Sequence, residues 1–249
     1  MTLHRMEVMD FGMSGSESRC LKSMATETLL HIPGGTRFGY HTGLPWKRAA
    51  RCLVEVGGDI RAGTGLHLLV APNGSGKTTL LRTLAGLSPA LQGRVTTAAQ
   101  VHYFADELRV DPEMKSRTFF RAWFTGAALA AAEKLADTLR LNLTTPIGKL
   151  SRGNRQKVLL ILAEVKAAQS AASVLLMDEP LTGLDAETRE QVTQLWATAG
   201  TQTLRLVIMH ELECVREADS LLTIAAGQLR HATSRSGSTW METYRTLHS

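Results

Sequence analysis

The sequence predicts an α/β fold with a mainly parallel sheet that helices cover on both sides. Short apolar or β-branched runs alternate with longer segments of helical periodicity, an order typical of parallel sheets. Two of the runs, Val174–Met177 and Leu204–Met209, are continuously apolar, which is typical of strands buried on both faces. Of the 249 residues, 44% are hydrophobic and 20% are charged, so the chain can bury a core and disorder of the whole chain is not expected.

The elements follow from these patterns in chain order. Residues 1–26 show no sustained period and are predicted to form a disordered N-terminal extension, unless translation starts at Met24. Strands are expected at Cys52–Val56 and His67–Val70, each bounded by glycine. Apolar residues at helical spacing predict helices at four ranges, Thr78–Leu87, Phe119–Leu141, Val158–Ala168 and Glu187–Ala199.

Composition excludes several classes of protein. No apolar run approaches the ~18–20 residues of a membrane span, so any action on a membrane would require a spanning partner. The start of the chain lacks the apolar core of a secretory signal. The three cysteines, Cys20, Cys52 and Cys214, lie far apart and match neither a disulfide framework nor a zinc site, which favours a reducing cytosol. The net charge of +5 indicates a solvated surface, and no nucleic-acid partner is predicted.

The most specific motif is APNGSGKTT, Ala71–Thr79, between a predicted strand and a predicted helix. This is the setting of a phosphate-binding loop. Two glycines let backbone N–H groups approach phosphate oxygens, and the helix N-terminus adds positive charge. Lys77 is expected on the β- and γ-phosphates, and the Thr78 hydroxyl is expected to ligate Mg²⁺. The predicted nucleotide contacts in this loop are Asn73, Gly74, Ser75, Gly76, Lys77, Thr78 and Thr79.

Ala71 stands where the phosphate-loop pattern has its first glycine. If the backbone there requires a positive φ, alanine costs roughly 1–2 kcal/mol. If it does not, the change is nearly silent, and the sequence leaves both alternatives open.

A pair of carboxylates follows the apolar strand in VLLMDEP, Val174–Pro180. Asp178 is expected to hold Mg²⁺ through water, and Glu179 to orient and polarise an attacking water molecule. Leu204–Met209 is followed directly by His210, a second polar residue at the end of a predicted buried strand.

Taken in order, these motifs resemble those of ABC-type ATPases, the nucleotide-binding subunits of ATP-binding cassette transporters. The resemblance runs from about Thr28 to Arg230 and includes the signature-like LSRGN at Leu150–Asn154. It implies a P-loop NTPase core with a mainly parallel sheet, an antiparallel β edge and a small helical subdomain inserted at about residues 107–150. The ATPase domain would span residues 27–232, with a C-terminal tail at 233–249.

The resemblance also implies a mechanism shared between two subunits. Two ATP molecules would lie between the phosphate loop of one cassette and the signature loop of the other, in a homodimer or a heterodimer. Glu179, His210 and Lys77 would be catalytic, and Ser151 and Gly153 would contact the partner's ATP, since Ser151 is a natural N-cap of the following helix. Asp185 would tie the two sites together. The further partner would be a transmembrane permease subunit, which places the chain in the cytoplasm on the inner face of the cell membrane.

Several positions depart from the family pattern or stay open. Arg152 and Asn154 replace the usual residues of the signature, and Arg152 either adds charge near phosphate or points to solvent. Asp106 stands where the family has a glutamine, and it could ligate Mg²⁺ in its place. The aromatic residue that stacks on adenine is assigned to Tyr40, with Trp46 an equal alternative and Phe38 a third candidate.

Four aromatic residues gather at Phe119, Phe120, Trp123 and Phe124, a spacing that makes one helical face. Packing within the helical subdomain is the favoured interpretation. The alternative is a groove that receives a helix from the membrane subunit, as this region does in the family.

Three classes of function compete. The favoured one is the ATPase subunit of a transporter, with an exporter slightly ahead of an importer and a haem-exporter-like subtype as one option. A soluble ABC ATPase without transport, such as an assembly scaffold or division factor, is the alternative. A cassette that binds ATP without hydrolysis is the third. The transported substrate cannot be identified, because its site would lie in the membrane partner.

Overall fold

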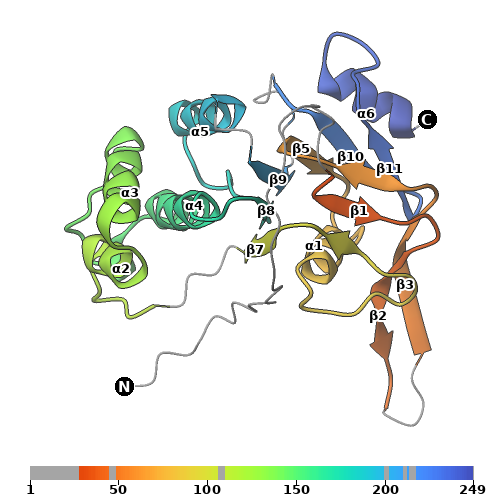
Figure 1. Cartoon of the computed structure of the whole chain (residues 1–249), viewed down its shortest axis with the longest axis horizontal. Coiled ribbons are helices and arrows are strands. Elements are labelled where there is room, and N and C mark those ends of the chain that lie inside the picture. The colour runs from red at the N-terminus through yellow and green to blue at the C-terminus, as the bar shows by residue number, and fades with distance from the viewer. Residues whose placement is uncertain are drawn as a thin grey trace, which may run out of the picture.

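The computed structural model describes residues 28–44, 49–105, 110–198, 202–209, 212 and 217–248 (Figure 1). The predicted N-terminal extension at 1–26 lies outside these ranges.

The main sheet has eight strands in the order β2-β3-β11-β10-β5-β9-β8-β7. Neighbours are parallel from β10 through β5, β9 and β8 to β7, whereas β2 pairs with β3, and β10 with β11, in antiparallel fashion. The bounds are β2 Arg37–Thr42, β3 Ala49–Val56, β5 Gly65–Val70, β7 Gln100–Phe104, β8 Ser173–Met177, β9 Thr203–Ile208, β10 Ser220–Ala225 and β11 Gln228–Ala232. The predicted parallel sheet with an antiparallel edge is therefore confirmed.

A second sheet of three short antiparallel strands has the order β4-β1-β6. Its strands are β1 Leu30–Ile32, β4 Ile60–Ala62 and β6 Thr96–Thr97. The helices are α1 Lys77–Leu84, α2 Ser116–Trp123, α3 Gly126–Thr138, α4 Arg152–Ala167, α5 Ala186–Thr198 and α6 Trp240–His248, with a 3₁₀ turn at Ile147–Lys149.

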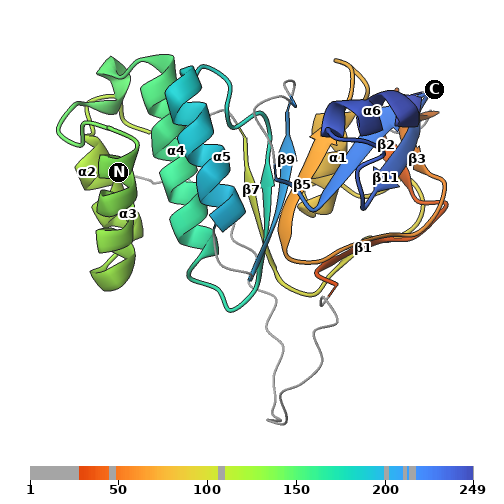
Figure 2. The same ribbon diagram turned by 90° about the horizontal axis from the view of Figure 1, so that it is seen from above.

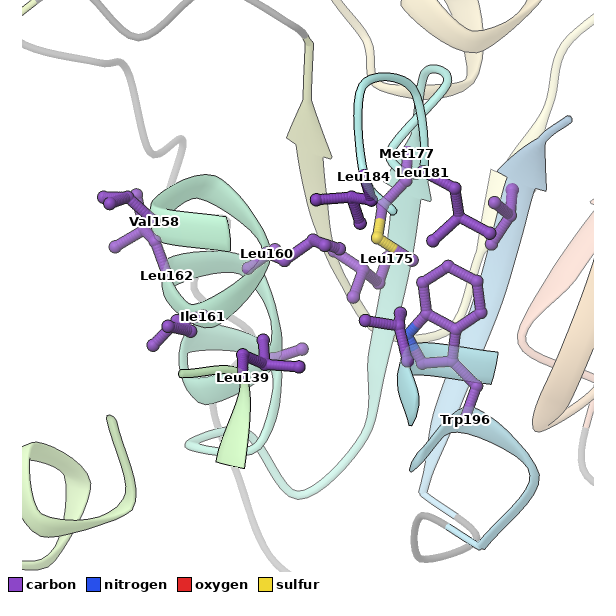
Figure 3. Close-up of a cluster of buried hydrophobic side chains, with 14 of the residues drawn as sticks. Leu139, Val158, Leu160, Ile161, Leu162, Leu175, Met177, Leu181, Leu184 and Trp196 are labelled. Carbon is purple, nitrogen blue, oxygen red and sulfur yellow. The ribbon is translucent and has the colours of Figure 1, made fainter. Parts of the chain in front are cut away.

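Two buried cores cover the two faces of the main sheet, as expected when its central strands are apolar throughout. One face packs against α1 and the small sheet. The other packs against α4 and α5, and α4 lies between the sheet and the pair α2 and α3 (Figures 1 and 2). Figure 3 shows this second core, where Leu160 of α4 and Trp196 of α5 meet Leu175 of β8. All residues of β8 and β9 are buried.

The prediction of one helix at Phe119–Leu141 is wrong in its continuity. The structure has two helices, because Phe124 and Thr125 adopt extended backbone with φ of −133° at both residues. Gly126 then begins α3 with a φ of 52°, a conformation that glycine adopts without steric cost. The alanine and leucine content favoured a continuous helix. The signal for the break is the pair of a β-branched residue, Thr125, and a glycine, Gly126.

The aromatic cluster is largely core. Phe119, Phe120 and Phe124 are 3% exposed or less, and Trp123 is partly buried. Phe124 follows the last residue of α2 in extended conformation, so the four side chains do not share one helical face. The burial supports the packing interpretation.

The predicted C-terminal tail contains α6, which packs against β10. Trp240 at its start is 3% exposed and belongs to the same core as α4 and α5.

Candidate nucleotide-binding site

The predicted phosphate loop connects β5, a central strand of the sheet, to α1. Gly74 and Gly76 have φ values of 76° and 100°, which glycine adopts without steric cost. A Cβ at Gly76 would also lie 3.0 Å from side-chain atoms of Leu53 and Val54. Gly76 is the N-cap of α1, and no side chain caps that helix in the part of the chain described. The first-turn N–H groups therefore suit an anion.

Lys77 is buried, with 6% of its surface exposed. Its Nζ donates to the carbonyl oxygens of Ala71 at 2.8 Å and Pro72 at 3.1 Å, and to Asn73 Oδ1 at 3.4 Å. Burial lowers the pKa of the Lys77 ammonium, and the nearby carboxylates of Glu179 and Asp178 oppose that shift. The ammonium is thus held inside the loop by neutral oxygens, which a phosphate could replace.

Ala71 does not carry backbone strain. Within the described ranges, the non-glycine residues with positive φ are Arg140, Glu179 and Ala226. Ala71 is not among them, so its replacement of the pattern's first glycine is the nearly silent alternative.

Thr78 and Asp178 meet although they lie 100 positions apart in the chain. The Thr78 hydroxyl donates to Asp178 Oδ2 at 2.8 Å, because α1 and β8 both present their polar ends at the same edge of the sheet. These are oxygen ligands of the kind that Mg²⁺ prefers. The described ranges contain no group of three or more histidine, cysteine or acidic side chains around a metal position. Mg²⁺ does not require such a group, because one carboxylate, a hydroxyl, water and substrate phosphates can bind it. The two residues fit the ion, and Asp106 lies outside the described residues.

Glu179 follows Asp178 in a left-handed conformation with a φ of 50°. For a residue with a side chain this conformation is strained, and such strain concentrates at functional sites. The Thr182 hydroxyl donates to Glu179 Oε2 at 3.4 Å, which holds the half-buried carboxylate close to the loop that follows β8. His210 lies outside the described residues.

The signature-like loop begins α4. Ser151 is the N-cap of this helix, and its Oγ accepts a hydrogen bond from the Asn154 backbone N–H at 3.2 Å. A Cβ at Gly153 would lie 2.5 Å from the Gly183 carbonyl oxygen, so only glycine fits there. The stem of Arg152 lies against Gly183, about 3.4 Å from the position of a Cβ on that residue. The signature and the loop that follows Glu179 are thus in contact within one chain.

Asp185 caps α5. Its Oδ1 accepts from the Thr188 backbone N–H at 2.8 Å and its Oδ2 from the Thr188 hydroxyl at 3.0 Å. These hydrogen bonds lower the pKa of the Asp185 carboxyl. The role of Asp185 across a dimer stays a prediction, and sequence reasoning missed this capping role, although an aspartate just before a helix is a common capping signal.

Tyr40 of β2 is 42% exposed and lines an open groove with Thr79, Arg82, Ser88 and Pro89. The groove therefore joins Tyr40 to the phosphate loop and α1. The guanidinium of Arg51, on the paired strand β3, lies 5.9 Å from the centre of the Tyr40 ring. Phe38 is fully buried and is not available for stacking on a ligand, and Trp46 lies outside the described residues.

Sequence reasoning also missed Gln156. This buried side chain of α4 donates from Nε2 to the Pro180 carbonyl oxygen at 3.0 Å. The bond links the signature helix to the residue that follows Glu179. Its only signal in the sequence is a polar residue at a position where the helix period predicts burial.

A family model described as ABC transporter matches residues 54–182, which include the phosphate loop, the signature and the acidic pair. The chain belongs to the ABC transporter family. This confirms the predicted family, the ATPase class and the P-loop NTPase fold.

Among its relatives, this cassette is 35% identical over 184 residues to the aliphatic sulfonates import ATP-binding protein SsuB 1 of Pseudomonas fluorescens, covering 66% of this chain and 68% of that protein. It is 31% identical over 144 residues to the cytochrome c biogenesis ATP-binding export protein CcmA of Mesorhizobium japonicum, covering 52% of this chain and 70% of that protein. A solved dimeric, post-hydrolysis ATP-binding cassette with bound ADP and Pi has a TM-score of 0.61 at 15% identity, covering 84% of this chain and 100% of that one. That likeness shows the shared fold.

None of the helices in the described part of this cassette has the length and apolar character needed to cross a membrane.

Proposed function

We propose that the cassette binds and hydrolyses ATP as the ATPase subunit of a transporter and drives a separate transmembrane permease subunit. The observation that carries the proposal is the 2.8 Å contact between Thr78 and Asp178. It brings a phosphate loop and an acidic strand end together in the arrangement that phosphoryl transfer requires. Residues 27–232 would form the ATPase domain.

In this proposal the chain acts mainly by positioning and electrostatics. Lys77 and the N–H groups of the phosphate loop neutralise charge that develops on the phosphates. Thr78 and Asp178 would hold Mg²⁺, which would supply Lewis-acid chemistry at the site when bound. Glu179 orients the water and accepts its proton. Asp106 and His210 are proposed to complete the site from their positions in the sequence.

The active unit is proposed to be a dimer of two cassettes, the same or different, at the cytoplasmic face of the cell membrane. Ser151 and Gly153 of one chain would donate to the ATP of the other. Ser151 is exposed at the start of α4, so a partner can reach it. Because half of each site comes from the other chain, a monomer should be nearly inactive.

We favour export over import, on the short stretch between the phosphate loop and the signature. Two of the relatives point in different directions, since one is named as an import protein and the other as an export protein. The CcmA relative is named for cytochrome c biogenesis and export, which supports an exporter of cytochrome c maturation as one subtype.

The test of hydrolysis is Glu179→Gln. This variant should still bind ATP, accumulate as an ATP-bound dimer and lose turnover by about 100-fold or more, because the water is no longer activated. Glu190→Gln, at an exposed position of α5, is the matched control and should keep wild-type turnover. Wild-type turnover in Glu179→Gln would exclude the role proposed for Glu179.

The test of the transporter assignment is purification of the full chain from detergent-solubilised membranes. Co-purification with a multi-span membrane protein supports the permease partner. A chain that purifies alone with full ATPase activity would favour a cassette that works without a permease.

A further inference from the structure

A buried ion pair lies behind the signature helix and connects three elements. Arg205 of β9 donates from Nη2 to Glu164 Oε2 at 2.8 Å, and from Nε to both carboxylate oxygens at 3.2 Å. The indole N–H of Trp196 on α5 donates to Glu164 Oε1 at 2.8 Å. The exposed fractions are 8% for Glu164, 6% for Arg205 and 3% for Trp196. We call these three residues the anchor.

The anchor occupies a place that an apolar residue would otherwise fill. Arg205 lies in the centre of the sheet, in register between Leu66 of β5 and Leu175 of β8, which are 2% and 0% exposed. Trp196 belongs to the apolar core of this face, and Figure 3 shows its indole nitrogen on the side of the ring that faces α4. Both carboxylate oxygens of Glu164 accept hydrogen bonds, so the buried charge is fully satisfied.

Stability does not account for this arrangement. Apolar residues of similar volume often replace a buried ion pair with no loss of stability, because both charges must be stripped of water. A bidentate guanidinium–carboxylate pair differs from apolar packing in being directional, since it fixes the angle and the register of the two groups. The anchor therefore restrains α4 against tilting and sliding on the sheet.

The three elements that meet at the anchor all lead to proposed site residues. Helix α4 begins after Ser151, and α5 begins after Asp185. Strand β9 ends at Ile208, shortly before His210 in the sequence. The hydrogen bonds of the anchor involve neither Ser151 nor Asp185, so its effect on these residues would be mechanical.

The length of α4 amplifies any tilt. Ser151 lies about 20 Å from Glu164 along the helix axis, at a rise of about 1.5 Å per residue. A tilt of about 5° at the anchor would move the helix N-terminus by about 1.7 Å, which is enough to break a hydrogen bond of normal length.

We propose that Glu164, Arg205 and Trp196 are positioning residues that fix the direction of α4, so that Ser151 and Gly153 reach the ATP bound by the partner subunit. The proposal rests on the dimeric ATPase function proposed above. It predicts that loss of the anchor lowers turnover without weakening the chain's own phosphate loop.

The decisive variant is the double replacement Glu164→Leu with Arg205→Met, which removes both charges and retains volume. We expect a melting temperature close to that of the wild type, because the gain from removing the buried ion pair offsets the cost of the buried Trp196 N–H that is left without its acceptor. ATP affinity should stay within about twofold. We expect kcat to fall by about tenfold or more, because the donors of the signature are misplaced. The matched control is Glu187→Leu with Arg140→Met, which removes an exposed ion pair whose Arg140 Nη2 and Glu187 Oε1 atoms are 2.8 Å apart. This control should keep wild-type kcat.

A second variant and a structural measurement keep the proposal testable if the double variant fails to fold. Trp196→Phe keeps a smaller aromatic ring and removes one hydrogen bond, and its kcat should fall by about threefold. Spin labels at Arg155→Cys on α4 and Arg245→Cys on α6, in a chain without its native cysteines, should show a broader or shifted distance distribution in either anchor variant.

The outcomes separate this proposal from the proposed function. If kcat and the label distances match the wild type in a folded anchor variant, the anchor does not position α4 and the proposal is overturned. If the wild type itself does not hydrolyse ATP, the proposed function fails, and the label distances then decide on the anchor by themselves.

Discussion

Lys77 and Arg205 are both 6% exposed, yet their surroundings are opposite. The Lys77 ammonium donates to two backbone carbonyls and one side-chain amide oxygen, all of them neutral. The Arg205 guanidinium is paired with the Glu164 carboxylate through three hydrogen bonds. A buried charge is costly unless an opposite charge pairs with it. Arg205 already has a hydrogen-bonded anion, whereas Lys77 does not.

This difference indicates that Lys77 is a ligand-binding residue and that Arg205 is a structural residue. Burial lowers the pKa of Lys77, and an incoming phosphate would supply the anion that its neutral acceptors do not. Lys77 also follows a loop with two glycines at positive φ, whose backbone can present N–H groups to a ligand. Arg205 already has its anion and sits inside a strand with neighbours on both sides, so no ligand can approach it.

The largest expected effect is on stability, and it comes from Arg205→Met as a single change. This change leaves the Glu164 carboxylate buried without its cation, so we expect the free energy of unfolding to fall by about 3–5 kcal/mol. Urea denaturation monitored by circular dichroism measures it. Lys134→Met, at an exposed position of α3, is the control. A loss below about 1 kcal/mol would mean that Glu164 finds another partner or water.

Lys77→Met should have the opposite profile. Without nucleotide, we expect the free energy of unfolding to change by less than about 1 kcal/mol, since the hydrogen-bond acceptors of the ammonium are neutral. ATP affinity should fall by about 100-fold, which corresponds to about 2.7 kcal/mol. Thermal unfolding with and without MgATP tests both, because ligand binding to the native state raises the melting temperature. If Lys77→Met unfolds as easily as Arg205→Met, Lys77 is architectural as well.

Much of this comparison was predictable from local sequence. The phosphate loop follows from nine consecutive residues, Ala71–Thr79, and strands β8 and β9 follow from continuous apolar runs. Such features depend on neighbours in the chain, so their signal is local. The contact of Thr78 with Asp178 was also predictable. Thr78 lies in the first turn of α1 and Asp178 directly follows β8, and these two ends meet at one edge of a parallel sheet.

The anchor could not be predicted in that way. Glu164 and Arg205 are 41 positions apart, and in the sequence each looks like a single charge in an apolar run. Only the packing of α4 on β9 shows that they pair. The break at Phe124 and Thr125 was missed for a related reason, since helix propensity outweighed a change in backbone conformation that buries Phe124.

A smaller effect is expected at the other end of the nucleotide. Tyr40→Ala should weaken ATP binding by about tenfold, close to 1.4 kcal/mol, the range measured for stacking of a base on an aromatic ring. Tyr40→Phe should bind as the wild type does. Equilibrium binding of a fluorescent ATP analogue measures both, and Trp46→Ala tests the alternative aromatic residue. If Trp46→Ala weakens ATP binding more than Tyr40→Ala does, the stacking residue is Trp46. If Tyr40→Ala weakens ATP binding more than Lys77→Met does, the phosphate contacts do not dominate the affinity.

The smallest effect is expected at Ala71, whose carbonyl is the nearest acceptor of Lys77 Nζ, at 2.8 Å. The backbone of Ala71 lies outside the positive-φ region, and its methyl group is buried, with 5% of the residue exposed. Ala71→Gly therefore relieves no strain and adds freedom to the unfolded chain, so we expect it to cost about 0.4–1 kcal/mol of stability. ATP affinity should stay within about twofold, since the carbonyl is unchanged. Chemical denaturation and ATP titration measure the two quantities. A gain in affinity of several-fold would show that the loop must pass through a left-handed conformation at this position to release Lys77 to the phosphates.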